Sequence, residues 1–266
     1  MGAVLLNAFL DPDIAIPSQL SDTLSYEDVA DAELRRELDI EARHTMELFA
    51  RRLRERIKSS ELPAVKFTTE VLEGLPEEVI TEYAKENVPS LIVMGTRESD
   101  KKGRELVGSV TAEVLDSCRF PIITIPESAS FRDLSDLHHA VLFCNLDQDD
   151  ILTMDALYGL FADRSLCVTL ISIPDRKGGG RLRRKAQSVE PLLEYCREHY
   201  PRFEYHAATM SPGNLVEDFE ALGRDRHIDF IVVSNKKKNM FARLFNPSLA
   251  HRLLFHADIP MMAIPV

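Results

Sequence analysis

Two glycine-containing segments carry the residue types that a phosphate group needs. Gly95 follows the apolar run 91–94, and Gly108 and Ser109 open a segment with helical apolar spacing. A glycine just past a strand lets the backbone approach a phosphate closely, and a Gly-Ser pair at a helix start offers free N–H groups, a hydroxyl and the positive end of the helix dipole. The pattern predicts a nucleotide phosphate site at the carboxyl ends of parallel strands. The alternative is that both glycines only end a strand and allow close helix packing.

Motifs for catalysis or metal binding are missing from the sequence. It contains no G-x-S-x-G elbow, no P-loop and no H-E-x-x-H motif. Its cysteines are too widely spaced for a redox pair or a zinc cluster. We therefore expect no metal, no enzymatic activity and four buried free thiols: Cys118, Cys144, Cys167 and Cys196.

Composition narrows the classes of partner. The 43 acidic residues outnumber the 32 basic ones, and the net charge of −11 argues against attraction to nucleic acid or to an anionic membrane. No apolar run approaches the length of about 18 residues typical of a membrane span, and the N-terminus lacks the pattern of a secretory signal. We expect a cytoplasmic protein without nucleic-acid or membrane partners.

A repeat organises the chain. The segment 90–126 aligns on the segment 229–265 without a gap, and the apolar pattern is kept although few residues are identical. The segment between the two halves has no clear period. The sequence therefore predicts two tandem domains, residues 1–127 and 138–266, joined by a linker at 128–137.

Short apolar runs alternate with helical patterns along both halves. Runs that are too short for helices and do not alternate are typical of parallel strands buried on both faces, so we expect an α/β fold with doubly wound parallel sheets. The expected strands are 3–7, 91–94, 122–125, 140–144, 167–173, 230–233 and 260–266. The expected helices are 31–59, 76–87, 108–118, 151–161, 181–199, 214–226 and 247–255. The apolar stripe of the longest helix is Leu38, Ala42, Met46, Phe49, Leu53 and Ile57.

The two copies differ at their beginnings. The strand at 3–7 matches the second strand of the later copy, 167–173, and nothing before it matches residues 140–163. The first copy thus lacks its leading strand and helix. That strand is usually central, so its loss should leave a hole in the sheet. We expect that the natural protein begins upstream or that the chain is truncated or mis-started; a segment supplied by another chain is less favoured.

Three segments carry a family resemblance: I-V-M-G-T-R at 92–97, G-S-V-T-A-E-V-L at 108–115 and P-I-I-T-I-P at 121–126. They resemble the universal stress protein family, whose ATP-binding members carry G-x-x-G, nine residues, then G-S or G-T. The resemblance implies an adenine nucleotide alpha hydrolase-like fold and a stress-response or signalling module that binds ATP with slow or no hydrolysis. It implies contacts to ATP in the first copy from Ala8, Met94, Gly95, Thr96, Arg97, Gly108, Ser109, Val110 and Thr111.

The sequence departs from the family pattern at several positions. Glu98 replaces the second glycine and adds a negative charge beside the expected phosphate, and the family's first-strand Asp is absent from the first copy. The second copy has lost the glycines, so we expect ATP in the first copy only. Its equivalent positions are Ser234, Lys237, Pro247 and Ser248. Asp147 is the candidate there for the family's Asp.

These departures favour an alternative function that does not involve nucleotide binding. In this alternative the protein is a nucleotide-free scaffold whose tandem copies replace a homodimer within one chain. The strands at 122–126 and 260–266 would be the pairing edges of the two copies. A homodimer of the whole chain is the other protein partner considered.

Overall fold

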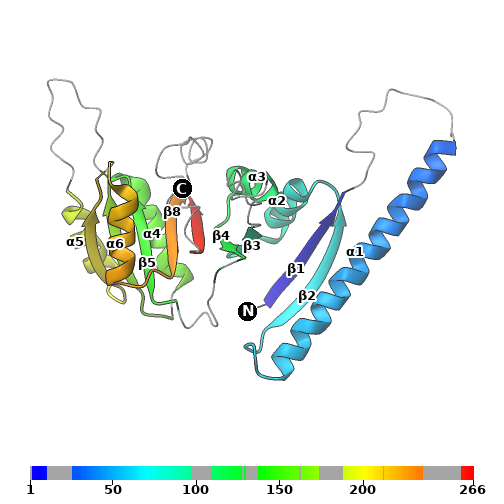
Figure 1. Cartoon of the computed structure of the whole chain (residues 1–266), viewed down its shortest axis with the longest axis horizontal. Helices are drawn as coiled ribbons and strands as arrows, with labels where there is room; N and C mark the ends of the chain where they lie inside the picture. The colour runs from blue at the N-terminus through cyan, green and yellow to red at the C-terminus, as the bar shows by residue number, and fades with distance from the viewer. Residues whose placement is uncertain are drawn as a thin grey trace. The chain divides into compact units, whose positions relative to one another are not determined.

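The computed structural model describes residues 2–10, 26–96, 109–127, 129, 137–161, 163–173, 188–211, 213–235 and 259–266. The chain divides into two compact units, residues 1–87 and 88–266. The first unit contains a two-stranded sheet and the second a seven-stranded sheet (Figure 1). The fold is α/β with mainly parallel sheets, as the sequence predicted.

Two strands and two helices make up the first unit. Strand β1 (Gly2–Phe9) pairs in parallel with β2 (Lys66–Glu73), and helix α1 (Tyr26–Lys58) connects them. Gly74 ends β2 by donating its N–H to the Phe9 carbonyl at 2.9 Å. Its φ is +140°, and an added Cβ would lie 2.9 Å from a Val79 methyl group, so only glycine fits this turn. Helix α2 (Pro76–Asn87), with the bounds that the sequence predicted, follows directly.

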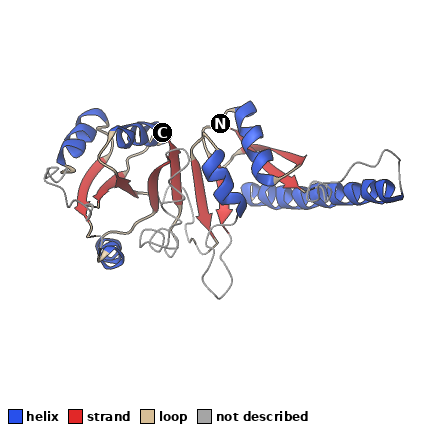
Figure 2. Ribbon diagram, turned by 90° about the horizontal axis from the view of Figure 1, so that it is seen from above, coloured by secondary structure: helices blue, strands red, loops and turns tan. Residues whose placement is uncertain are grey.

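Helix α1 is longer than the sheet beside it. Its 33 residues span about 50 Å, against about 27 Å for an eight-residue strand, and part of it runs past the strands (Figures 1 and 2). Met46 and Ala50 are buried, whereas Phe49 is 51% exposed. The prediction that Phe49 belongs to the buried stripe was wrong, because Ala50 occupies the sheet-facing position. No described helix, α1 included, combines the length and apolarity needed to cross a membrane.

The second unit is built on seven strands in the order β3-β4-β9-β8-β5-β6-β7. All neighbours are parallel except β4 and β9, which pair antiparallel with Ile123 opposite Met262. These are the two strands that the sequence nominated as pairing edges. The strands are β3 (Ile92–Thr96), β4 (Ile122–Pro126), β5 (His139–Cys144), β6 (Cys167–Ser172), β7 (Glu204–Thr209), β8 (Phe230–Asn235) and β9 (Met261–Pro265).

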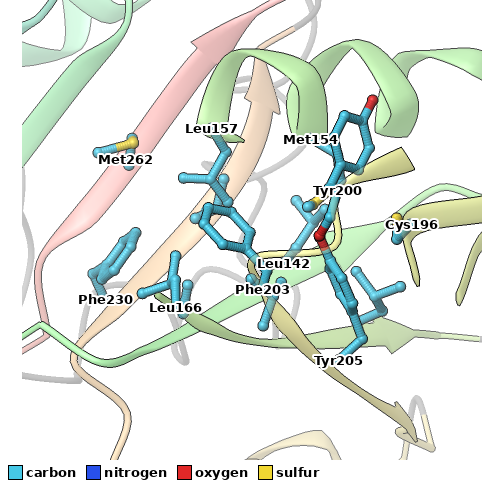
Figure 3. Packing of buried hydrophobic residues seen from close by; sticks show 14 of the residues in the cluster. Leu142, Met154, Leu157, Leu166, Cys196, Tyr200, Phe203, Tyr205, Phe230 and Met262 are labelled. Atoms are coloured by element: carbon cyan, nitrogen blue, oxygen red, sulfur yellow. The ribbon is translucent and has the colours of Figure 1, made fainter. Parts of the chain in front are cut away.

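Helices cover both faces of the β5–β9 part of this sheet. Helices α4 (Gln148–Leu160) and α5 (Glu190–His199) lie on one face, and α6 (Leu215–Asp225) lies on the other (Figure 2). Met154 and Leu157 of α4 point toward Leu142 of β5 in the main core (Figure 3). On the opposite face the ring of Phe143 stacks on that of Phe219 at 6.2 Å. Successive residues of one strand therefore point into the cores on opposite faces of the sheet, as a doubly wound fold requires.

The repeat is visible in the register of paired strands. Ile92 pairs with Ile122 and Ile231 with Met261, which are equivalent positions of the two copies. The first residue of each pair also makes the same backbone hydrogen bond to a proline. Ile92 N–H donates to the Pro121 carbonyl at 2.8 Å, and Ile231 N–H donates to the Pro260 carbonyl at 2.9 Å. The order β9-β8-β5-β6-β7 is therefore matched in the first copy by β4-β3 and β1-β2, with no described strand in the place of β5.

The strand pairing differs between the copies where the first copy lacks its leading strand. In the second copy β5 pairs with both β8 and β6, whereas their first-copy equivalents β3 and β1 belong to separate sheets. The prediction that residues 91–94 are buried on both faces was wrong. Val93 is 62% exposed, and exposed residues alternate with partly buried ones along β3, so one face of this strand is not covered by described residues.

Contacts divide the chain at a different point from the repeat. The compact units meet at Asn87 and Val88 rather than at the expected linker, because β4–β9 pairing draws β3 and β4 into the sheet of the second copy. Most of the linker, the expected helix at 247–255 and residues 181–187 of another lie outside the described residues. The repeat domains 1–127 and 138–266 stay a prediction from the sequence.

Candidate phosphate-binding site

The carboxyl end of β3 carries the first part of the candidate site. Met94, Gly95 and Thr96 are its last residues, so the strand continues through the glycine that was expected to follow it. Gly95 is exposed, and a Cβ added there would meet no described atom within 4 Å. Its φ does not lie in the left-handed region that favours glycine. The described surroundings therefore give no steric reason for glycine at this position.

Helix α3 (Ser109–Ser117) carries the second part. Thr111, Val114 and Leu115 are buried and fix one face of the helix. Its first turn holds no acidic residue, whereas those of α2, α4, α5 and α6 each carry Asp or Glu. Carboxylates near a helix N-terminus are stabilised by the positive end of the dipole. The described first turn of α3 has no such carboxylate, which is an electrostatic condition that favours binding an anion.

The β3-α3-β4 connection brings these two parts to the same end of the sheet. Because β3 and β4 are parallel, α3 must run back against them, and its N-terminus lies at the carboxyl end of β3. This places Met94, Gly95 and Thr96 on the strand and Ser109, Val110 and Thr111 at the helix start. The connecting residues, with Arg97, Glu98 and Gly108, lie outside the described residues. Ala8 lies on β1 of the other unit, so the structure does not place it against them.

The equivalent positions of the second copy form structural hydrogen bonds. Ser234 matches Gly95, and its Oγ accepts a bond from Asn145 Nδ2 at 3.3 Å. Asn235 matches Thr96, and its Nδ2 donates to the Leu115 carbonyl in α3 at 2.5 Å. Sequence reasoning missed both bonds. The repeat alignment marks Asn235 as the counterpart of a predicted site residue, but it cannot show that the amide reaches the other copy.

Asp147, the candidate of the second copy for the family's Asp, precedes α4 directly. Its carboxylate accepts the Asp149 N–H at 3.2 Å as the N-cap of the helix. Asp150, which the sequence did not single out, is fully buried and accepts backbone N–H bonds from Asn145 at 3.1 Å and Leu146 at 2.6 Å. Burial raises the pKa of Asp150, and these bonds oppose the rise. The spacing of Asp147 and Asp150 is that of a capping box.

The cysteines are free thiols, and two of them are buried as expected. Cys118 and Cys196 are buried, whereas Cys144 and Cys167 are only partly so. Burial raises the pKa of Cys196 to about 12, which leaves it as an unreactive thiol at neutral pH. Across the described ranges, no group of three or more His, Cys, Asp or Glu side chains could hold a metal ion.

Comparison with known proteins relates the first copy to a family. Residues 4–126 match the model of the universal stress protein family. This part of the chain is therefore similar to universal stress protein domains. A universal stress protein of Methanocaldococcus jannaschii is 38% identical over 68 residues, which are 26% of this chain and 40% of the relative. The chain thus matches less than half the length of that relative.

Solved structures support the fold over more of the chain. A universal stress protein of Archaeoglobus fulgidus superimposes with a TM-score of 0.63 at 14% identity, over 92% of this chain and 84% of the other. A putative universal stress protein of Pseudomonas aeruginosa gives 0.52 at 10% identity, over 98% and 92%. At these identities the likeness concerns the α/β fold alone. The match to the family model covers the first copy, including the residues of both parts of the candidate site.

Proposed function

We propose that the first copy binds an adenine nucleotide, with ATP as the expected ligand, and that the protein is a nucleotide-responsive stress or signalling module of the cytoplasm. The observation that carries the proposal is the N-terminus of α3, which has no acidic residue in its first turn and lies at the carboxyl end of β3. A phosphate there would accept hydrogen bonds from the first backbone N–H groups of the helix. The function is binding with slow or no hydrolysis, not catalysis.

The residues of the site fit such a ligand. Gly95 faces open space among the described residues, so a phosphate could approach the backbone there. The resemblance assigns further contacts to Met94, Thr96, Arg97, Gly108, Ser109, Val110 and Thr111, with Ala8 near the base. Bound ATP would supply the phosphate group that these residues would hold. The chain's own part is to orient that ligand.

The second copy serves in this account as a structural partner. Ser234 and Asn235 occupy the positions of Gly95 and Thr96, and both are engaged in hydrogen bonds within the protein. Two tandem domains, 1–127 and 138–266, are then specialised: the first binds the ligand and the second supports it. Their pairing through β4 and β9 would make this chain an internal counterpart of a dimer.

A nucleotide-free scaffold is the second candidate. The antiparallel pairing of β4 with β9 favours it, because this pairing joins the copies without any ligand. Glu98 favours it too, since its charge would repel a phosphate. In this case the tandem would expose docking surfaces to a protein partner, or to a second copy of the chain.

Native mass spectrometry of the gently purified full-length protein separates the two candidates. We expect retained adenine nucleotide, or uptake of added ATP, in the wild type. Gly108→Arg should abolish it, because the side chain would fill the helix start. Pro247→Arg makes the same change at the equivalent position of the second copy and should leave binding intact.

The hydroxyl offers a finer test of the same site. Ser109→Ala should weaken ATP binding roughly tenfold through the loss of one hydrogen bond to a charged group. Ser248→Ala at the equivalent position should not change it. Absence of binding by the wild type would contradict nucleotide binding and leave the scaffold. Equal loss in both variants of a pair would contradict a site confined to the first copy.

A further inference from the structure

Helix α3 is held at its two ends by different copies. Its N-terminus carries the proposed phosphate contacts of the first copy, and its last turn receives a side chain from the second. Asn235, at the end of β8, donates its amide Nδ2–H to the Leu115 carbonyl at 2.5 Å. Carbonyls in the last turn of a helix have no N–H donor within the helix to pair with. The second copy thus supplies a C-terminal bond that α3 does not make for itself.

The bond is buried and its donor is fixed. Leu115 is fully buried and Asn235 is 8% exposed, so water does not readily replace either partner. The Asn235 backbone is tied into the sheet on its own side, because its carbonyl accepts the Val266 N–H at 3.3 Å and it pairs with Pro265. A fixed amide that meets a buried carbonyl sets the position of the helix along its axis.

From this geometry we infer that Asn235 is a positioning residue: it couples the second copy to the nucleotide site of the first by holding α3 in place. The inference rests on the proposed function for its ligand, but the structural coupling can be measured without one. The repeat alignment supports this role for Asn235, because Asn235 occupies the position that Thr96 occupies in the first copy. The same strand position would contact ligand in one copy and support the ligand-binding helix in the other.

Two other bonds provide controls. Thr124 Oγ1 donates to the Met261 carbonyl at 3.3 Å, a buried side-chain bond between the copies that does not involve α3. Asn87 Nδ2 donates to the Tyr83 carbonyl at 3.0 Å in the last turn of its own helix α2. Thr124→Val tests loss of a copy-to-copy bond, and Asn87→Ala tests loss of an amide cap as such.

Hydrogen exchange of the full-length protein, read by mass spectrometry, tests the coupling. Asn235→Ala should make the α3 amides exchange about tenfold faster, while β5 and β6 keep the wild-type rate. Asn235→Leu, which fills the space but lacks the donor, should do the same and serves if the alanine variant folds poorly. Thr124→Val and Asn87→Ala should leave α3 unchanged. Wild-type exchange of α3 in both Asn235 variants would overturn the inference.

ATP titration of the same proteins tests the link to the site. We expect Asn235→Leu to weaken ATP binding about threefold to tenfold, with Thr124→Val at the wild-type value. By reciprocity, ATP should slow exchange at the C-terminal Val266 in the wild type and not in Asn235→Leu. Equal ATP affinity in wild type and Asn235→Leu would overturn the coupling while the proposed function stands. No ATP binding by the wild type would overturn the proposed function and the coupling to it, with the exchange of α3 still deciding whether Asn235 positions the helix.

Discussion

The second copy and the first unit have similar strands but very different packing. In β5 the residues Ala140, Val141 and Leu142 are fully buried, between α4 and α5 on one face and α6 on the other. In β1 no described residue is buried, although its sequence is as apolar. The difference lies in the leading strand and helix, which only the second copy shows. Strand pairing alone therefore does not make a core; the central strand and its helix do.

The contrast extends to the polar groups. The better-packed copy has used its motif positions, Ser234 and Asn235, for internal hydrogen bonds. The less packed copy has kept a glycine in open space and a helix start without carboxylates. A ligand site requires such unfilled positions, whereas a supporting copy does not.

Removing a buried aromatic ring from the second unit should change the free energy of unfolding most. Phe230 is fully buried and stacks on Phe161 at 5.5 Å, whereas Phe49 is 51% exposed. Phe230→Ala should lower the free energy of unfolding of the second unit by about 3–5 kcal/mol. Phe49→Ala should change stability by less than about 0.5 kcal/mol. Urea unfolding followed by circular dichroism measures both. Similar losses would show that α1 packs more tightly than the structure has it.

A second effect concerns the leading helix, which only the second copy shows. Asp150→Ala removes the acceptor of the Asn145 and Leu146 N–H groups. We expect a loss of about 1–3 kcal/mol in the free energy of unfolding, because these donors would be left without a partner. Asp163→Ala, on the loop after the same helix, is the control. An unchanged urea midpoint in Asp150→Ala would show that the carboxylate does not hold the start of α4.

Two glycines of the first copy distinguish a glycine that the fold requires from one that ligand binding would require. Gly74→Ala should destabilise the first unit by about 1–3 kcal/mol, since its φ is +140° and the added Cβ would lie 2.9 Å from Val79. Gly95→Ala should change stability by less than about 0.5 kcal/mol, yet weaken ATP binding. Urea unfolding and ATP titration of both variants measure this. A large stability loss in Gly95→Ala would favour the packing explanation of that glycine.

The smallest effect is a pH dependence of the second copy. His139 is buried, its ring nitrogens lie 2.8 Å from the His227 carbonyl and from Thr169 Oγ1, and burial lowers its pKa from 6.5. The unfolded chain therefore takes up the proton first. The stability contribution of neutral His139 is complete above about pH 6.5 and is lost as the pH falls toward the lowered pKa. His139→Gln should flatten this slope in urea midpoints, whereas the exposed His138→Gln should not. A wild-type slope in His139→Gln would contradict a buried neutral ring.

Helices and strands were predicted well where their positions depend on interactions between residues close together in the sequence. Pro76 with two following acidic residues marks the start of α2, and its bounds were predicted in full. The apolar pattern of the repeat located β3, β4, β8 and β9, and the absence of a leading strand predicted the break between the sheets. These features depend on residue spacing, which a sequence displays.

Burial and partnership were harder to predict. The run at 91–94 looks like a strand buried on both faces, but its exposure depends on what packs over each face of the sheet. Phe49 and Ala50 differ by one position on a helix, and the more apolar residue is the exposed one. The bond from Asn235 to Leu115 joins residues far apart in the chain, so no local pattern indicates it.

Photolabelling of the full-length protein with 8-azido-ATP, followed by peptide mapping, shows which copy holds the nucleotide. We expect saturable labelling, blocked by excess ATP, on peptides within residues 1–127 and not within 138–266. Gly108→Arg should remove the label and Pro247→Arg should keep it. Saturable labelling of the second copy, or none in either, would contradict the claim that the first copy alone binds the nucleotide.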